Sequence, residues 1–472
     1  MNILHTSFEC YPVAKVGGLA DVVGALPKYQ NQLGHQSQVI MPFYDNKFTQ
    51  EHKFAIVFKG TVQLADSVFS YTIKEEVENS LDFKVFYVDI PELLFRNNVY
   101  TYSDDLDRFL GFQMAVLDWL KNEELNIGLI HCHDHHTGLV PFLITQTEEF
   151  QSLRKIPTVL TIHNAQYQGQ FGYNDLNKLP DFDQKNIGLL DWHGSINPLA
   201  AAIKCSWSVT TVSPNYMKEL KKEANGLEEL LSQEHKKCKG ILNGIDTETW
   251  NPETDPMLVK TFSSRNLSTG RKKNKEWLCE QYNLDAERPL FAFIGRLVGE
   301  KGADLLPFIV KETLGITPEP AIFILGSGHK EVEKQLADIK GKYPERYNVY
   351  IGYDEELSHI IYGGADFLLM PSRVEPCGLN QMYALRYGCV PIVRRTGGLK
   401  DTVIDIGDGG FGICHDQALV WDVCYSIKRA VQLYEDQDRF KKIQKKIIKI
   451  DHSWNRSAEE YIALYKSLKL PI

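Results

Sequence analysis

The stretch Lys15-Val16-Gly17-Gly18-Leu19-Ala20-Asp21-Val22-Val23-Gly24 places a cation and two adjacent glycines between an apolar run and an amphipathic segment. The apolar run Met1–Ser7 predicts a strand, and the spacing of apolar residues predicts a helix over about Leu19–Leu33. A glycine pair at such a junction lets backbone N–H groups approach an anion, and the helix dipole favours negative charge there. The stretch therefore predicts a phosphate-binding loop, unless the glycines only make a tight turn and Lys15 is solvated.

The stretch matches neither of two common nucleotide-binding loops, G-x-x-x-x-G-K-[ST] and G-x-G-x-x-G. An NAD-binding fold would also place an acidic residue at the end of the second strand. Here that strand, Ser37-Gln38-Val39-Ile40-Met41, is followed by Pro42. A Rossmann oxidoreductase is therefore disfavoured, and nicotinamide binding would be needed to restore that interpretation.

Length predicts two domains, and composition excludes several classes of protein. A chain of 472 residues is longer than the chains that usually fold around one hydrophobic core. The formal net charge of −9 argues against a nucleic-acid partner, because phosphate-tracking surfaces need clustered lysine and arginine. Nine cysteines without CxxC spacing indicate neither a disulfide framework nor a zinc ribbon, which favours a reducing, cytoplasmic compartment. We expect no signal peptide and no membrane partner, since no apolar run approaches the roughly 18 residues of a span.

Strand-like and helix-like segments alternate over residues 1–215 and again from about 288, which is typical of parallel sheets covered by helices. Five apolar runs predict strands in the second half: Leu290–Ile294, Ala321–Leu325, Val349–Ile351, Phe367–Met370 and Val390–Val393. Glycines and cations follow these runs, at Gly295-Arg296, Gly326-Ser327-Gly328, Gly352-Tyr353, Pro371-Ser372-Arg373 and Arg394-Arg395-Thr396-Gly397-Gly398. Because open α/β sheets bind ligands at the carboxyl ends of their strands, these segments predict a binding site.

Glu375 is the first catalytic candidate. It lies in Arg373-Val374-Glu375-Pro376-Cys377-Gly378-Leu379, after a predicted strand and before a helix. A carboxylate at a strand end, beside a proline that stiffens the turn, is placed to face a bound ligand. An acidic residue that only serves the start of a helix is the alternative interpretation.

Arg296 and Lys301 stand on either side of a turn that follows another predicted strand. A guanidinium and an ammonium at one strand end suit the diphosphate of a nucleotide donor, because both stabilise charge on a leaving phosphate. Solvated turn cations are the alternative. Thr396-Gly397-Gly398 offers a further backbone N–H cradle at the start of a helix.

The run His131-Cys132-His133-Asp134-His135-His136 suggests a metal site at first sight. Consecutive residues on a strand alternate between its faces, so at most every second side chain could converge. We therefore favour a sugar-hydroxyl contact by Asp134 over a metal. His163, at the end of another apolar run, is either a ligand-facing side chain or a satisfied core histidine.

Together these segments closely resemble the bacterial glycogen synthase and plant starch synthase family, whose members transfer glucose from ADP-glucose to an α-1,4-glucan. The matching motifs are Lys15–Pro27, His133-Asp134, Thr161-Ile162-His163-Asn164, Val212-Ser213-Pro214, Leu242-Asn243-Gly244-Ile245-Asp246, Arg296-Leu297, Lys301-Gly302, Glu375-Pro376-Cys377-Gly378-Leu379, Arg394–Leu399 and Ser453-Trp454. The resemblance implies a GT-B architecture, an α/β fold of two doubly wound Rossmann-like domains that face each other across a deep cleft. The expected domains are residues 1–243 and 244–450, with a helix over 451–472 that crosses back to the first domain.

The resemblance also implies roles for individual residues. Glu375 would bind the transferred glucose and support the reaction centre, and His163 would lie beside the sugar. Arg296 and Lys301 would hold the diphosphate, and Tyr353 would stack on the base. Donor contacts are implied for Lys15, Gly17, Gly18, Asn243, Tyr353, Cys377, Gly378, Leu379, Thr396, Gly397 and Gly398, and acceptor-side contacts for Asp134, Tyr100 and Tyr102.

The family retains the α configuration and needs no cofactor or essential metal. Because no second acid accompanies Glu375 in its motif, front-face transfer is favoured over double displacement. Departures from the family pattern affect the acceptor side: His135 stands where tryptophan is common, and Asp105 where asparagine is usual. Two alternatives stay open from the sequence, namely UDP-glucose as the donor and a catalytically silent glucan-binding scaffold of the same fold.

Overall fold

The computed structural model describes residues 1–123 and 125–468, and they form two compact units. The first unit comprises Met1–Ile241 together with the segment that starts at Trp454, and the second comprises Leu242–Ser453. The expected boundaries, after residues 243 and 450, lie a few residues from these. Residues 469–472 of the expected terminal helix lie outside the described residues.

A nine-stranded sheet forms the centre of the first unit, with the strand order β11-β10-β7-β6-β1-β2-β5-β4-β3. All neighbouring strands from β11 to β5 are parallel, and β4 and β3 extend the sheet as an antiparallel pair. The strands are β1 (Asn2–Thr6), β2 (Gln36–Pro42), β3 (Phe54–Leu64), β4 (Ser67–Glu76), β5 (Lys84–Asp89), β6 (Leu129–His133), β7 (Thr158–Ile162), β10 (Ser208–Thr211) and β11 (Cys238–Gly240), with β8 (Asp191–Trp192) and β9 (Ser195–Ile196) as a separate hairpin. The chain order reverses between β1 and β6, so a ligand site is expected at the carboxyl ends of those strands.

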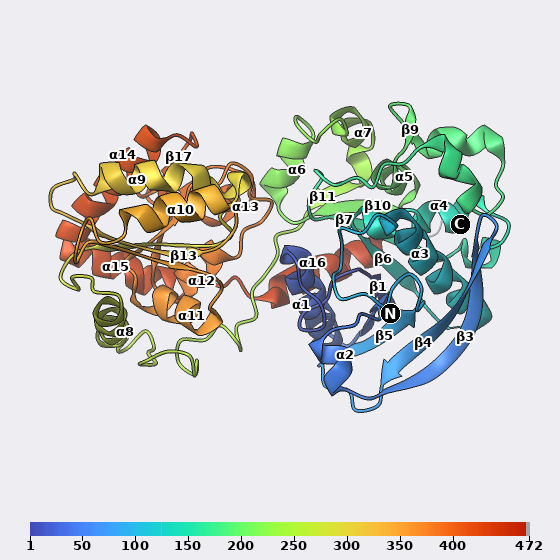
Figure 1. Cartoon of the computed structure of the whole chain (residues 1–472), viewed down its shortest axis with the longest axis horizontal. Coiled ribbons are helices and arrows are strands. Elements are labelled where there is room, and N and C mark those ends of the chain that lie inside the picture. The colour runs from blue at the N-terminus through green and yellow to red at the C-terminus, as the bar shows by residue number, and fades with distance from the viewer. Residues whose placement is uncertain (124, 469–472) are drawn as a thin grey trace. The chain divides into compact units, whose positions relative to one another are not determined.

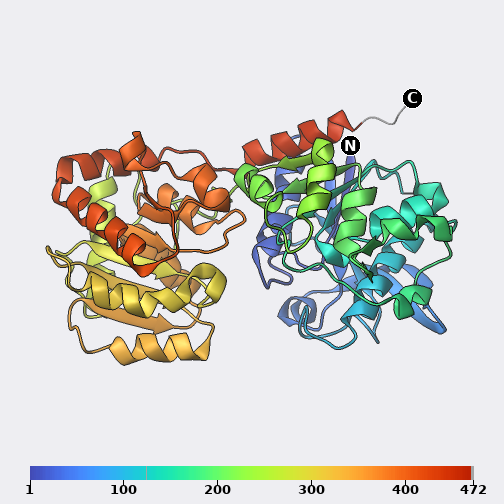
Figure 2. The same cartoon turned by 90° about the horizontal axis from the view of Figure 1, so that it is seen from above.

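Helices cover both faces of this sheet. They are α1 (Gly18–Gln32), α2 (Lys47–Glu51), α3 (Asp105–Asn122), α4 (Val140–Gln146), α5 (Pro198–Cys205), α6 (Pro214–Leu220), α7 (Glu228–Gln233) and α16 (Trp454–Ser467). The last helix packs beside α1, where Trp454, Tyr461 and Tyr465 are buried against Leu26 and Ile3 (Figures 1 and 2). Its aromatic residues therefore anchor the helix to the first unit.

The second unit contains a six-stranded parallel sheet with the order β14-β13-β12-β15-β16-β17. Its strands are β12 (Leu290–Ile294), β13 (Ala321–Gly326), β14 (Tyr347–Ile351), β15 (Phe367–Met370), β16 (Val390–Arg394) and β17 (Ile413–His415). This is the strand order of a doubly wound Rossmann-type sheet, in which the order of the strands across the sheet reverses between the first and fourth strands. That reversal lies between β12 and β15.

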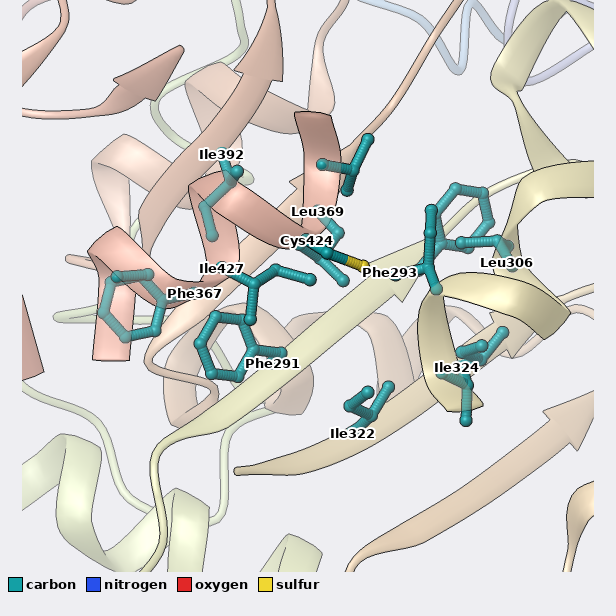
Figure 3. Packing of buried hydrophobic residues seen from close by; sticks show 14 of the residues in the cluster. Phe291, Phe293, Leu306, Ile322, Ile324, Phe367, Leu369, Ile392, Cys424 and Ile427 are labelled. Carbon is teal, nitrogen blue, oxygen red and sulfur yellow. The ribbon is translucent and has the colours of Figure 1, made fainter. Parts of the chain in front are cut away.

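The core of the second unit has two layers, because alternate residues of each strand point to opposite faces. Phe291 and Phe293 of β12 pack with Ile427 on one face (Figure 3), whereas Leu290 and Ala292 pack on the other. Figure 1 shows α9 and α10 on one side of the sheet and α11 and α12 on the other. The helices are α8 (Leu267–Gln281), α9 (Leu306–Thr313), α10 (Lys330–Ile339), α11 (Glu355–Gly364), α12 (Asn380–Arg386), α13 (Gly397–Thr402), α14 (Val420–Glu435) and α15 (Gln437–Ile447). Within residues 1–123 and 125–468, no helix has the length and apolar character to cross a membrane.

Candidate active site

In the second unit, three of the predicted catalytic residues follow β12 and β15, the two strands at the reversal point. Arg296 follows β12, Lys301 ends the short 3₁₀ helix Gly299–Lys301, and Glu375 follows β15. Gly302 brings the first loop against the second: its φ is +67°, and a Cβ there would lie 3.1 Å from the carbonyl carbon of Pro371 and closer to its oxygen. Only glycine allows this approach without strain.

Lys301 and Glu375 form an ion pair. The Nζ atom of Lys301 lies 2.6 Å from Oε1 and 2.7 Å from Oε2 of Glu375, and the hydroxyl of Ser372 donates to Oε2 at 3.0 Å. Glu375 is only 5% exposed. Charge-assisted hydrogen bonds on both oxygens fix the orientation of the carboxylate.

Arg296 differs from Lys301, because its side chain is 61% exposed and lies 3.6 Å from the Glu300 carboxylate. The loop that carries both cations is held by Arg373, whose guanidinium contacts both carboxylate oxygens of Asp304 at 2.6 and 2.8 Å. That guanidinium lowers the pKa of Asp304 below its usual range. The loop is thus anchored at Asp304, while the Arg296 guanidinium extends into solvent.

The Gly397-Gly398 pair packs directly on the turn that contains Glu375. Gly397 has φ +45°, and a Cβ there would lie 2.8 Å from the carbonyl carbon of Glu375. The Gly398 N–H donates to the carbonyls of Glu375 and Pro376, both at 3.2 Å. In this structure the Gly398 amide therefore has protein acceptors, and its donation to a phosphate remains a prediction. Thr396 is buried immediately before the pair.

The remaining predicted donor residues of the second unit surround the same turn or follow β14. Cys377 is buried, and burial raises the pKa of its thiol to about 12, which disfavours a nucleophilic thiolate. Asn243 is buried beside Cys377, and its Oδ1 has no hydrogen-bond partner among the residues that the structure describes. Gly378 and Leu379 lead into α12. Tyr353, after β14, is 80% exposed, so its ring face is accessible for stacking.

In the first unit, the Lys15 loop is organised by an acidic residue that the sequence analysis did not identify. Glu9 is buried, and its Oε2 accepts the N–H groups of Val16 at 2.6 Å and Gly17 at 2.8 Å. Its Oε1 accepts the hydroxyl of Tyr100 at 2.9 Å. The only sequence signal was an acid shortly after the first strand.

Lys15 itself is partly exposed and contacts Asp21 at 2.6 Å. A Cβ added at Gly17 or Gly18 would meet no described atom within 4 Å. These two glycines are therefore not required by packing, in contrast to Gly397 and Gly398. Open space beside their backbone is the geometry that close approach of a ligand requires.

Asp134 and His163 meet at the carboxyl ends of β6 and β7. The Oδ1 of Asp134 accepts the backbone N–H of His163 at 2.7 Å. Burial raises the pKa of Asp134 to about 7 and lowers that of His163 to about 3. Asp134 also has φ +56° and ψ −173°, a conformation that costs a non-glycine residue roughly 1–3 kcal/mol and is concentrated at functional sites.

The two predicted acceptor-side tyrosines differ in their surroundings. Tyr100 stacks on His136 with ring centroids 4.6 Å apart and binds Glu9 through its hydroxyl. Tyr102 donates to Asn97 at 2.7 Å, and the Arg108 guanidinium lies 4.7 Å above its ring. Tyr100 therefore contacts the acidic residue that organises the Lys15 loop, whereas Tyr102 stabilises the loop in which it lies.

Among the described residues, His5, His131 and His133 form a buried group whose ring nitrogens lie within 4.8 Å of one another. Such a group could hold a metal ion by distance alone. Every ring nitrogen of the three is, however, hydrogen-bonded to another protein side chain. The ring nitrogens of these histidines thus have protein partners, and the preference for a sugar contact over a metal stays a prediction.

Comparison with known proteins covers nearly the whole chain. Residues 2–233 match the starch synthase catalytic domain family, and residues 274–447 match the glycosyl transferases group 1 family. A glycogen synthase of Flavobacterium johnsoniae is 54% identical, with 98% of each chain covered, and one of Alkaliphilus metalliredigens is 37% identical, with 99% of this chain and 100% of its own covered. The solved catalytic domain of starch synthase IV from Arabidopsis thaliana, bound to ADP and acarbose, has a TM-score of 0.90 at 33% identity over 98% of each chain.

Proposed function

We propose ADP-glucose as the glucosyl donor of this chain, which belongs to the glycogen synthase and starch synthase family. The chain is a glycosyltransferase that extends a glucan. The solved starch synthase IV domain that shares its fold is bound to ADP, which supports an adenine nucleotide. The nine cysteines are all free thiols, which fits a reducing, cytoplasmic compartment.

The observation that carries the assignment of the donor site is the Lys301–Glu375 pair at the reversal point of the second sheet. We assign Arg296 and Lys301 to the diphosphate, because an exposed and a partly buried cation there can neutralise charge on the leaving group. They would supply the positive charge for which other transferases use a divalent cation. Tyr353 would stack on the base, which makes it indifferent to whether the base is adenine or uracil.

We assign Glu375 to orient the glucosyl group, and not to attack it. Both oxygens of Glu375 accept charge-assisted hydrogen bonds from Lys301, which lower the nucleophilicity of the carboxylate. Front-face transfer requires no protein nucleophile. The bond between the anomeric carbon and the phosphate oxygen breaks, the acceptor hydroxyl oxygen bonds to the same face, and its proton passes to the departing phosphate.

In the first unit, His163 is assigned to the glucosyl group, and Lys15 with Gly17 and Gly18 to the donor. Asp134 and Tyr100 are assigned to the acceptor side. The Asp134 carboxyl holds the backbone of His163, so its effect on the acceptor would combine with positioning of that histidine.

The test is a side-by-side comparison of initial rates with labelled ADP-glucose and UDP-glucose on a glycogen primer. We expect faster transfer from ADP-glucose and complete release of the label by an α-specific glucosidase. A large preference for UDP-glucose would refute the proposed donor. Label that resists the α-specific enzyme would refute retention of configuration.

A further inference from the structure

Buried hydrogen bonds connect the ring of His163 to two helices of the first unit. Strands β1, β6, β7 and β10 contribute to one continuous set of contacts, because they are near neighbours in the sheet. The buried members of this set are His5, Gln30, His131, His133, Thr161, Thr210 and Tyr465. A neutral imidazole has one donor and one acceptor nitrogen, so the direction of each hydrogen bond determines the next.

We assign the directions from one end of the set, where a backbone carbonyl, which can only accept, lies within hydrogen-bond distance of Thr210. The hydroxyl of Thr210 donates to the carbonyl oxygen of Leu160 at 3.2 Å. Thr210 must therefore accept the hydrogen bond that it shares with Thr161 at 2.6 Å, and Thr161 is the donor. With its only hydrogen used, Thr161 must accept from Nε2–H of His131 at 2.6 Å.

The constraint continues to the side-chain amide of Gln30. Because Nε2 of His131 carries the proton, its Nδ1 accepts the hydroxyl of Tyr465 at 2.7 Å. The Tyr465 oxygen then accepts from Nε2 of Gln30 at 3.3 Å. The amide oxygen of Gln30 therefore points away from Tyr465. It accepts the hydroxyl of Ser37 at 2.6 Å and faces His5.

Hydrogen bonds through the rings of His5 and His133 connect that amide oxygen to the ring of His163. Nε2 of His5 lies 2.9 Å from Oε1 of Gln30 and must donate to it. Nδ1 of His5 therefore accepts from Nε2–H of His133 at 3.0 Å. Nδ1 of His133 in turn accepts from Nε2–H of His163 at 3.0 Å. The proton of His163 is thus placed on Nε2.

These hydrogen-bond directions require neutral imidazole rings, and burial keeps the rings neutral. Burial lowers the pKa of His5 to about 4 and that of His163 to about 3. It holds the pKa values of His131 and His133 well below the usual range, where the neighbouring imidazoles add to the effect. Near neutral pH each ring therefore carries one proton.

We propose that Gln30, through His5 and His133, fixes His163 in its Nε2–H tautomer and so presents Nδ1 as a hydrogen-bond acceptor for a hydroxyl of the glucosyl group. Within residues 1–123 and 125–468, no hydrogen bond engages the Nδ1 of His163, and the residue keeps 8% exposure. Gln30, His5 and His133 are positioning residues, since they act through His163. The part that concerns the hydroxyl rests on the function proposed above, whereas the tautomer does not.

This arrangement would let the site select a sugar that carries a hydroxyl group at the position facing Nδ1 of His163. An acceptor nitrogen at the edge of a buried network gains a hydrogen bond from an O–H group, but nothing from a hydrogen or an ether oxygen. A site built to bond a hydroxyl discriminates strongly against the analogue that lacks it, because the polar group of the site is left unpaired.

The tautomer is tested directly by NMR of the full chain with ¹⁵N-labelled histidine at neutral pH, using long-range nitrogen–proton correlations. The signals of His163 are identified by their loss in His163→Asn. We expect a protonated Nε2 and an unprotonated Nδ1. A proton on Nδ1 would overturn the proposal, and this outcome does not depend on the folding of any other variant.

Gln30→Leu and Ser37→Ala form a matched pair. Both variants remove the buried hydrogen bond between the Ser37 hydroxyl and the Gln30 amide oxygen. Only Gln30→Leu also removes the acceptor that orients His5. We expect Gln30→Leu to lose the single tautomer at His163 and Ser37→Ala to keep it. An unchanged tautomer in folded Gln30→Leu would overturn the role of Gln30.

Donor analogues that each lack one hydroxyl of the glucose supply the kinetic test. For the wild-type chain, one deoxy analogue should be used with a much lower kcat/KM than the others. That discrimination should shrink by about fivefold to tenfold in Gln30→Leu, the fold-change of one neutral hydrogen bond, and stay in Ser37→Ala. A general structural defect would slow all donors by the same factor, and that result would overturn the proposal. Absence of transfer from any donor, with the Nε2–H tautomer present, would instead overturn the proposed function and leave the tautomer standing.

Discussion

Replacement of Gly397 by alanine tests how the second unit holds Glu375. Gly397 has φ +45°, and a Cβ there would lie 2.8 Å from the carbonyl carbon of Glu375 and 3.3 Å from the carbonyl oxygen of Pro376. Carbon atoms in contact prefer about 3.5–4.0 Å, so the turn that carries Glu375 must move by about 1 Å. The neighbours are backbone atoms, which cannot move away by a change of rotamer.

The cost has two parts. An alanine in the left-handed region costs roughly 1–2 kcal/mol, and relief of the overlap costs about 1–3 kcal/mol, so the unfolding free energy should fall by about 2–5 kcal/mol in total. The effect on turnover should be larger than stability alone predicts. A displacement of about 1 Å at a catalytic group can cost about 10²-fold in rate, because the carboxylate would leave its contacts with Lys301 and Ser372.

The assay combines initial rates on a glycogen primer with urea unfolding. Gly341→Ala is the control, because Gly341 lies in the same unit at φ +84° but its Cβ would meet no described atom within 4 Å. It should lose only the conformational part, about 1–2 kcal/mol, and keep its rate. If folded Gly397→Ala retained the kcat of the wild type, the packing of Gly397 against the Glu375 turn would have no catalytic role.

Three further outcomes are expected. Glu375→Ala should lower kcat by roughly 10²–10³-fold, the usual effect of losing one preorganised electrostatic group, while circular dichroism shows an intact fold; turnover near the wild-type value would contradict its assignment. Gly18→Ala should leave thermal unfolding unchanged, because its Cβ meets nothing described within 4 Å, yet lower kcat/KM by about tenfold if one backbone contact to the donor is lost; an unaffected kcat/KM would remove Gly18 from the donor site. Burial lowers the pKa of His5 from 6.5 to about 4, so its contribution to stability is complete above pH 6.5 and falls by about 3 kcal/mol as the pH drops toward 4. His5→Phe should reduce the slope of the urea-unfolding free energy against pH over that range, while the other buried histidines keep their share of it, and an identical slope in both proteins would refute this origin.

Five of the six strands of the second unit could be predicted because each of these five is a short apolar run with a clear end, whereas the three-residue strand β17 (Ile413–His415) was missed. β12 and β15 coincide with the predicted runs Leu290–Ile294 and Phe367–Met370. β14 begins two residues earlier than predicted, at Tyr347, where a tyrosine and an asparagine hide the strand pattern. Local composition thus determines these strands, and their parallel order places the glycine-rich and cationic ends at one edge of the sheet.

What the sequence could not reveal are contacts that depend on how two loops meet. Arg296 and Lys301 look equivalent as cations after a strand, but only Lys301 is paired with Glu375, since Gly302 lies against Pro371. Gly397-Gly398 reads as a phosphate cradle by composition. In the structure the pair also fills a close backbone contact, which no spacing rule distinguishes from a ligand site.

The first unit shows the same limit. Alternation along a strand correctly places His131 and His133 on one face, but it does not say what they meet. The register of β1 beside β6, which sets His5 opposite His131, brings the third imidazole into the group. Glu9 is likewise invisible as a loop organiser until Val16 and Gly17 are seen to donate to it.

The histidine network gives the last helix of the chain a share in the site of the first unit. The chain leaves this unit after Ile241 and re-enters it at Trp454, so the second unit is inserted in the sequence of the first. α16 then supplies Tyr465, which accepts from Gln30 and donates to His131. Loss of that hydroxyl would leave two buried polar groups unpaired, each at a cost of roughly 1–3 kcal/mol. Rotation of the Gln30 amide would relieve part of this cost, but it would also reverse the constraint on the three imidazoles. The proton of His163 therefore depends on a phenol from the opposite end of the chain.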